Sequence, residues 1–181
     1  GLGDVYKRQG LYNVSYDPVS EITITSGATQ AIFTAITAFV KEQDEVIIFT
    51  PAYDCYQPAV ELSGGKPVFV QLKAPYYSVN WEEVKKLISQ KTKMIIINTP
   101  HNPTGTILSR DDMLELEKIT SESEIIVLSD EVYEHIIFDQ IEHESICRYK
   151  GLAARSMAVF SFGKTFHVTG WKMGYCICLL Y

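Results

Sequence analysis

Short runs of apolar and β-branched residues alternate along this chain with longer segments in which apolar residues recur every three or four positions. A short continuous apolar run is typical of a strand that is buried on both faces of a sheet, whereas the longer spacing is typical of an amphipathic helix. The pattern predicts seven strands, over residues 22–25, 46–49, 68–72, 94–98, 125–128, 157–160 and 174–179.

Four helices are predicted between the strands, over residues 28–40, 56–62, 81–89 and 110–120. In the first helix Ile32, Ile36 and Phe39 share one face, and Ser109 has the side chain of an N-cap for the last helix. Strands that alternate with helices in this way build a mainly parallel sheet with crossover helices. The sequence therefore predicts an α/β fold with a seven-stranded sheet flanked by helices.

A lysine follows the sixth predicted strand, within the small-residue segment Ser161-Phe-Gly-Lys164. Open α/β sheets bind ligands in the crevice beyond the carboxyl ends of their strands. An amine at that place can form a Schiff base with a carbonyl group. Lys164 is therefore a candidate covalent anchor for a cofactor.

A second candidate site is the segment Ser26-Gly27-Ala28-Thr29, which joins the first predicted strand to its helix. Its backbone N–H groups, its small side chains and the helix dipole together suit a phosphate group. A tight strand-to-helix turn without a ligand is the alternative. The Gly-Lys-Ser/Thr ending of a P-loop and the GxGxxG pattern are both absent, which disfavours ATP and NAD.

Four more side chains follow predicted strand ends: Tyr53, Asn102, Asp130 and Tyr133. A carboxylate at Asp130 is costly without a cationic or proton-donating partner, which indicates a ligand; capping of the next turn is the alternative. Tyr133, three residues later, can lean towards the same ligand. Asn102 offers an amide donor or a plain turn residue, and Tyr53 offers a stacking ring or a core side chain.

Composition and charge narrow the class of protein. The net charge is −6, and no Lys/Arg-rich run is longer than Lys85-Lys86, so neither a nucleic-acid partner nor an anionic membrane partner is expected. With no signal peptide and no apolar run that could span a bilayer, a cytoplasmic location is expected. The cysteines and histidines match no metal-binding spacing, so we expect reduced thiols and no metal site. Ser161 and His167 lack the GxSxG elbow of a hydrolase.

Five motifs occupy the strand ends in order: SGATQ at 26–30, PAYDCY at 51–56, NTPHNPTG at 98–105, LSDEVYEHI at 128–136 and SFGKTFHVTGWKMGY at 161–175. Together they resemble the large domain of fold-type I enzymes that use pyridoxal 5′-phosphate (PLP), specifically class I/II aminotransferases. Their wording is most similar to the branch that contains methionine aminotransferase and the kynurenine/glutamine transaminases. The resemblance covers nearly all of residues 10–178 and implies a three-layer α/β/α fold.

The resemblance implies a role for each candidate around the cofactor ring. Lys164 forms the Schiff base with PLP and then moves a proton between the substrate and the cofactor. Asp130 pairs with the pyridine nitrogen and keeps it protonated. Asn102 and Tyr133 hydrogen-bond the O3′ oxygen of the cofactor, while Tyr53 stacks on its ring.

The phosphate group of the cofactor has its own implied ligands: Gly27, Ala28, Thr29, Ser161 and Lys172. Lys172 stands where an arginine is commoner in the superfamily, although lysine fits the kynurenine/methionine branch. A lysine acts on phosphate as a point charge without the two-pronged geometry of a guanidinium group.

The implied reaction moves an amino group from a methionine-, aromatic- or glutamine-like amino acid to a 2-oxo acid. A PLP-dependent C–S β-lyase is an alternative, because the leaving group and the rest of the site decide the outcome after proton removal. The aminotransferase-like domain of a transcriptional regulator is another.

The two ends of the sequence differ from the rest. Residues 1–9 show no periodicity and are expected to be a non-native leader, and residues 10–181 are expected to be the PLP-binding large domain. The resemblance places a substrate-binding arginine in a small domain beyond residue 181, and a phosphate-binding tyrosine in the N-terminal region of the partner in a homodimer. The chain is therefore expected to be a fragment that is inactive alone.

Overall fold

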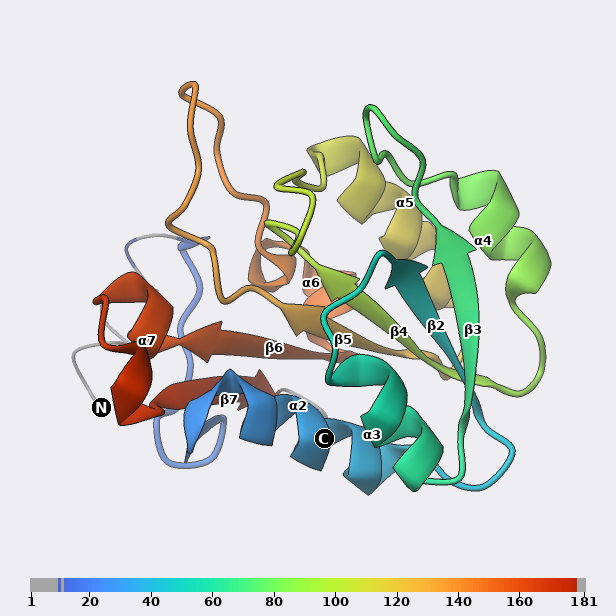
Figure 1. Cartoon of the computed structure of the whole chain (residues 1–181), viewed down its shortest axis with the longest axis horizontal. Coiled ribbons are helices and arrows are strands. Elements are labelled where there is room, and N and C mark those ends of the chain that lie inside the picture. The colour runs from blue at the N-terminus through green and yellow to red at the C-terminus, as the bar shows by residue number, and fades with distance from the viewer. Residues whose placement is uncertain (1–9, 11, 179–181) are drawn as a thin grey trace.

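One seven-stranded sheet organises the computed structural model, which describes residue 10 and residues 12–178 (Figure 1). The strand order is β1-β7-β6-β5-β4-β2-β3. The strands are β1 (Ile22–Thr25), β2 (Glu45–Thr50), β3 (Lys66–Gln71), β4 (Thr92–Asn98), β5 (Ile126–Asp130), β6 (Ser156–Ser161) and β7 (Gly174–Cys178). β7 runs antiparallel to its neighbours β1 and β6, and the other neighbouring pairs are parallel. The seven predicted strands are confirmed; residue 179 and the predicted leader at 1–9 lie outside the described residues.

The four predicted helices are also confirmed, as α2 (Gly27–Phe39), α3 (Tyr56–Leu62), α4 (Trp81–Leu87) and α5 (Arg110–Ser121). The prediction of a helix to residue 89 was wrong by two residues, because Ile88 is extended (φ −68°, ψ 130°) and the Ser89 N–H donates to Thr92 Oγ1 instead of continuing the helix. Two helices of four residues, α6 (Lys150–Ala153) and α7 (Phe162–Thr165), were not predicted. One turn is too short to show a helical period.

The helices lie on both faces of the sheet and enclose two apolar cores. α2 and α3 cover one face, whereas α4, α5 and α6 cover the other (Figure 1). Successive residues of β2 alternate between the cores: Ile47 and Phe49 pack with the side of α4 and α5, and Val46 and Ile48 pack with the side of α2 and α3. Burial on both faces explains the continuous apolar runs of the central strands. The three-layer α/β/α prediction is confirmed.

The parallel strands bring their polar carboxyl ends to one edge of the sheet. In the register, Asn98 pairs with Asp130 and Asp130 pairs with Val159. Since β7 runs the other way, its first residue, Gly174, reaches the same edge and pairs with Ser161. A Cβ on Gly174 would lie 2.7 Å from the backbone nitrogen of Ala28, so only glycine allows β7 to pack against the start of α2.

Candidate active site

A cavity of about 480 Å³ opens at this edge of the sheet, beyond the ends of β4, β5 and β6 and beside the start of α2. The structure brings all of the sequence-predicted site residues together in its wall: Gly27, Ala28, Thr29, Tyr53, Asn102, Asp130, Tyr133, Ser161, Lys164 and Lys172. These residues come from five separate segments of the chain, so the fold assembles a single site from them.

The start of α2 forms one end of the cavity. Gly27 has a φ of +77°, a conformation that favours glycine, and the N-cap residue Ser26 makes no side-chain hydrogen bond to the helix. The first-turn N–H groups of this 13-residue helix are therefore not capped by the Ser26 side chain. Backbone atoms of Lys172, itself in a left-handed conformation (φ 52°), lie 3.9 Å from where a Cβ of Gly27 would stand. This end of the cavity suits an anion, because helix N-termini and lysine both attract negative charge.

Lys164 lies on α7, the one-turn helix that follows β6. Ser161, the last residue of β6, caps this helix by accepting a hydrogen bond from the Lys164 N–H at 3.3 Å. The Lys164 Nζ atom stands 5.6 Å from the centre of the Tyr133 ring. Gly163 is buried beside Thr169, whose Cα would lie 3.0 Å from an added Cβ. The small residues around Lys164 thus allow the segment 161–169 to fold tightly and hold the amine at the cavity.

Asp130 is the last residue of β5 and is 3% exposed. Its Oδ2 atom accepts a hydrogen bond from Tyr56 Oη at 2.5 Å, and its Oδ1 atom accepts one from the Val132 N–H at 3.3 Å. Burial raises the pKa of Asp130 to about 6, although these two hydrogen bonds act in the opposite direction. The bond from Val132 shows that the turn-capping alternative is realised as well, but the same carboxylate also lines the cavity.

Asn98 ties the neighbouring loop to β5. Its Nδ2 atom donates to the backbone oxygen of Asp130 at 2.9 Å, and its Oδ1 atom accepts from the Asn102 N–H at 2.7 Å. Sequence reasoning missed Asn98 and Tyr56 as site residues, although both lie in the quoted motifs. A buried polar residue at the end of β4 could have pointed to Asn98. Nothing in the sequence shows that Tyr56, on the buried face of α3, reaches Asp130 across 74 positions.

Tyr53 lines the cavity and is 36% exposed, so the alternative of a core side chain is not realised. Its ring contacts that of Tyr56 edge-on, with 5.9 Å between the ring centres. Tyr133 is half-buried in the same wall. Two aromatic rings and two amide or carboxylate groups therefore surround the space in front of Lys164.

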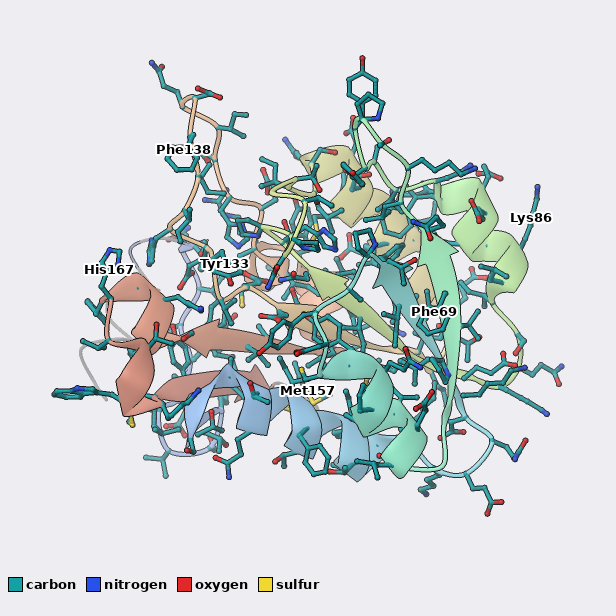
Figure 2. The ribbon with its side chains drawn as sticks, viewed as in Figure 1. Phe69, Lys86, Tyr133, Phe138, Met157 and His167 are labelled. Carbon is teal, nitrogen blue, oxygen red and sulfur yellow. The ribbon has the colours of Figure 1, made fainter. Side chains whose placement is uncertain are left out.

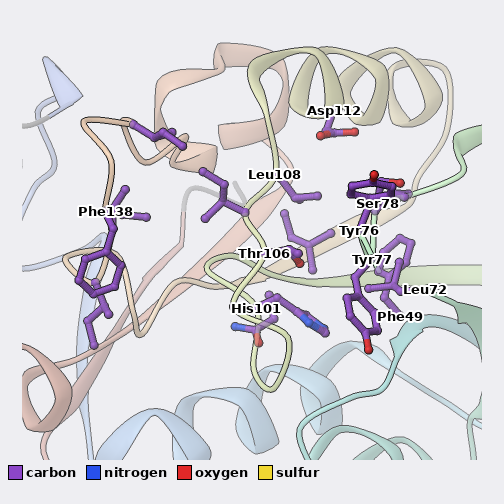
Figure 3. A pocket seen from close by; sticks show the side chains of 18 of the residues that line it. Phe49, Leu72, Tyr76, Tyr77, Ser78, His101, Thr106, Leu108, Asp112 and Phe138 are labelled. Atoms are coloured by element: carbon purple, nitrogen blue, oxygen red, sulfur yellow. The ribbon is translucent and has the colours of Figure 1, made fainter. Parts of the chain in front are cut away.

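The structure has a second cavity, of about 430 Å³ (Figure 3). Among the described residues, Asn98 is the one that lines both cavities. Its wall includes the apolar side chains of Phe49, Leu72 and Leu108, together with His101. Burial lowers the pKa of His101, which favours the neutral imidazole. None of the predicted site residues lines this second cavity.

In the described part of the chain, no group of three or more His, Cys, Asp and Glu side chains is arranged to hold a metal ion. The same residues contain no helix that is long and apolar enough to cross a membrane. The four cysteines are free thiols, and burial raises the pKa of Cys55 and that of Cys176 to about 12, so neither is a thiolate at neutral pH.

We expect removal of the Tyr56 hydroxyl group, which donates a hydrogen bond to Asp130, to lower the stability of the chain. In Tyr56→Phe the ionised carboxylate loses a charge-assisted hydrogen bond, so the free energy of unfolding should fall by about 1–3 kcal/mol at pH 8. The loss should be smaller at pH 5, because a group with a pKa of about 6 is then mostly protonated. Urea unfolding at the two pH values measures the difference, with the exposed Tyr76→Phe as control. An equal loss at both pH values would mean that Tyr56 contributes packing alone.

Comparison with known proteins gives a consistent family. The model of the family described as aminotransferase class I and II matches residues 4–179. Methionine aminotransferase of Escherichia coli (strain K12) is 48% identical over 171 residues, which are 94% of this chain and 44% of that protein. Kynurenine–oxoglutarate transaminase 3 of Homo sapiens is 37% identical over 182 residues, covering 95% of this chain and 40% of that protein.

Solved structures agree. A protein from Escherichia coli with a methionine aminotransferase function superposes with a TM-score of 0.95 at 47% identity, over 97% of this chain and 46% of that one. Cystalysin of Treponema denticola, whose crystal structure contains PLP, superposes with a TM-score of 0.90 at 26% identity, over 97% of this chain and 45% of that one. The chain thus spans less than half the length of the proteins it matches. Since the family model covers nearly all of its residues and the fold is that of the fold-type I enzymes, this chain belongs to the class I and II aminotransferases.

Proposed function

We propose that this chain is the cofactor-binding part of a PLP-dependent aminotransferase. The observation that carries the proposal is the single cavity in which the Lys164 amine, the buried Asp130 carboxylate and the uncapped start of α2 meet. PLP offers a matching group to each of them: an aldehyde, a basic ring nitrogen and a phosphate. When bound, it supplies a ring that accepts the electron pair left on a substrate carbon after proton removal.

The residues present fit the phosphate at one end of the cavity. The first-turn N–H groups at Gly27, Ala28 and Thr29 would donate to its oxygens, while Ser161 would offer a hydroxyl group and Lys172 a positive charge. These groups orient the cofactor without entering the chemistry.

The ring end of the cavity is held by other side chains. Asp130 would accept a hydrogen bond from the protonated ring nitrogen. The pKa of Asp130, which is about 6 in the cofactor-free chain, would fall beside that positive charge. Asn102 and Tyr133 would donate to the ring hydroxyl oxygen, and Tyr53 would cover one face. Lys164 would hold the aldehyde carbon covalently and, when free, move the proton at the α-carbon of the substrate.

The proposed class of amino donor is inferred from the relatives that this chain resembles. Because the chain is similar to methionine aminotransferase and to kynurenine–oxoglutarate transaminase 3, we propose a methionine-, aromatic- or glutamine-like amino donor and a 2-oxo acid acceptor.

We also propose that the protein is a homodimer and that it is located in the cytoplasm. Phe166 and Trp171 are exposed apolar side chains close in sequence to Lys164 and Lys172, and we expect a second copy to cover them.

The reaction is tested by completing the chain. We expect a chimera, in which this chain replaces the matching 44% of the Escherichia coli methionine aminotransferase, to convert methionine and a 2-oxo acid into the corresponding new amino acid. The same chimera with Lys164→Ala is the control and should be inactive. S-methylcysteine, whose sulfur is on the β-carbon, tests the alternative: accumulation of methanethiol and ammonia from it, without a new amino acid, would replace the transaminase proposal with the C–S β-lyase.

A further inference from the structure

The last residue of β5 and the turn that follows it, residues 130–135, form a segment that we call the β5 turn. This segment carries ionisable side chains on two sides. Asp130 and Tyr133 line the proposed cofactor cavity, whereas Glu131 and Glu134 are buried away from it, with exposed fractions of 0% and 6%. The proposed function uses neither glutamate. A carboxylate fully removed from water is costly unless neighbouring groups hold its charge.

Three donors with described geometry hold the Glu131 carboxylate. Its Oε1 atom accepts from Ser129 Oγ at 2.8 Å and from the Ile146 N–H at 2.9 Å, and its Oε2 atom stands 2.8 Å from His143 Nε2. Burial alone would raise the pKa of Glu131, but the hydrogen bonds, led by that of His143, outweigh burial and lower it. Glu131 is therefore ionised at neutral pH, and His143 carries a proton on Nε2 in order to donate to it.

These contacts join the turn to a distant part of the same loop. The chain between β5 and α6 leaves the sheet edge, extends outward and returns (Figure 1), and His143 and Ile146 lie on the returning part. Tyr12 adds a second link, since its Oη atom donates to Glu134 Oε2 at 2.5 Å and its ring meets that of His143 edge-on. Both buried glutamates are thus held by residues that lie outside the turn: Glu131 by His143 and Ile146, and Glu134 by Tyr12.

We propose that Glu131 and His143 are positioning residues that hold the β5 turn, and with it Asp130 and Tyr133, in the orientation the cofactor requires. The proposal rests on the proposed function, because it concerns the same cavity. Glu131 directly follows Asp130 and precedes Tyr133 by two positions, and His143 contacts Glu131. A rotation of this turn would move both site side chains together.

The chemistry of the pair favours positioning over plain packing. Apolar side chains of similar volume would fill this space without the cost of a buried charge. A buried carboxylate is stabilised by its hydrogen bonds only in a narrow range of geometry, so the bond from His143 favours one arrangement of the turn. The Glu131 N–H adds to this by donating to Val159 O at 2.9 Å, which prolongs the pairing with β6 past Asp130.

Two variants of His143 separate donation from packing. His143→Leu removes the donor, while His143→Gln keeps an N–H donor near the position of Nε2. We expect His143→Leu to weaken PLP binding about tenfold, the loss typical of partners one shell away from a bound group. We also expect amide hydrogen exchange in residues 131–136 of the cofactor-free chain to become about tenfold faster. His143→Gln should restore both to within about threefold of the original chain, and the exposed Glu142→Gln on the same loop is the control.

The outcomes distinguish the two proposals. If the original chain fails to attach PLP at Lys164, the proposed function fails, while the exchange measurement on the cofactor-free chain still decides whether the pair holds the turn. The positioning proposal is overturned if His143→Leu keeps the original exchange and affinity, or if His143→Gln loses as much as His143→Leu. Should His143→Leu not fold, Glu131→Gln, which keeps the size of the side chain, takes its place, with the same two losses expected and unchanged values overturning the proposal.

Discussion

Lys164→Ala is expected to abolish covalent attachment of PLP to this chain. The other lysine in the cavity wall, Lys172, lies at the phosphate end beside Gly27, whereas the Lys164 Nζ atom stands over the Tyr133 ring. In the completed enzyme the same amine is also proposed to move the substrate proton. Turnover should therefore fall by about 10⁴-fold, the upper range for loss of a general acid–base group.

Borohydride reduction followed by peptide mass analysis measures the attachment. The original chain should carry the reduced cofactor on the peptide that contains Lys164, and the visible absorbance of the bound cofactor should disappear on reduction. Lys86→Ala, which removes an exposed lysine from α4 (Figure 2), is the matched control and should leave the adduct unchanged. A cofactor adduct that forms in Lys164→Ala at the same yield as in the original chain would contradict the assignment of Lys164 as the residue that binds PLP covalently.

Asp130→Asn is expected to have two opposite effects. The affinity for PLP should fall about 10- to 100-fold, because a neutral amide loses a charge-assisted hydrogen bond to the ring nitrogen. The cofactor-free chain should become more stable above pH 6, because the variant no longer buries a charge. The difference between a pKa of about 6 and the ordinary 3.8 corresponds to ~3 kcal/mol. A site residue that destabilises the fold is typical of functional positions.

The sign of the pH dependence follows from proton binding. Because the folded chain holds the Asp130 proton more tightly than the unfolded chain does, the contribution of Asp130 to stability is most favourable below about pH 4 and declines as the pH rises to about 6. Asp130→Asn has no such group. The stability gained by the variant should therefore be small at pH 4 and reach its maximum above pH 6.

Urea unfolding of the cofactor-free proteins between pH 4 and 8 measures this difference, and fluorescence titration measures the affinity for PLP. Asp139→Asn, in the exposed loop after β5, is the control for loss of a carboxylate that is not buried. A variant that is less stable than the original chain at pH 8 would contradict the burial argument. Unchanged affinity would contradict the proposed pairing with the ring nitrogen.

The fold could be predicted from the sequence because its central strands are buried on both faces. Runs such as Met94 to Ile97 have no polar residue with which to face solvent, so only an inner strand of a covered sheet accommodates them. The residue at which α4 ends and the presence of the one-turn helices α6 and α7 could not be predicted. One-turn helices depend on local hydrogen bonds, such as that from the Lys164 N–H to Ser161, which leave no periodic pattern.

The candidate site was predicted to the extent that its residues follow strands. Parallel strands end at one edge, so Asp130, Ser161 and Asn102 had to be neighbours once the sheet was inferred. Tyr56 and Asn98 were missed as site residues because their roles depend on which buried groups they meet. Neither the burial that raises the pKa of Asp130 nor the hydrogen bond from Tyr56 that opposes it is written in the local sequence.

The sequence by itself determined the α/β class, the seven strands, the lysine on its small-residue segment and the family resemblance, because each rests on residue type and spacing along the chain. Only the tertiary structure decided that Tyr56 reaches Asp130 and that His143 contacts Glu131 behind the site. The physical reason is distance along the chain. Contacts between residues 12 to 74 positions apart depend on how the layers pack, and packing belongs to the whole fold.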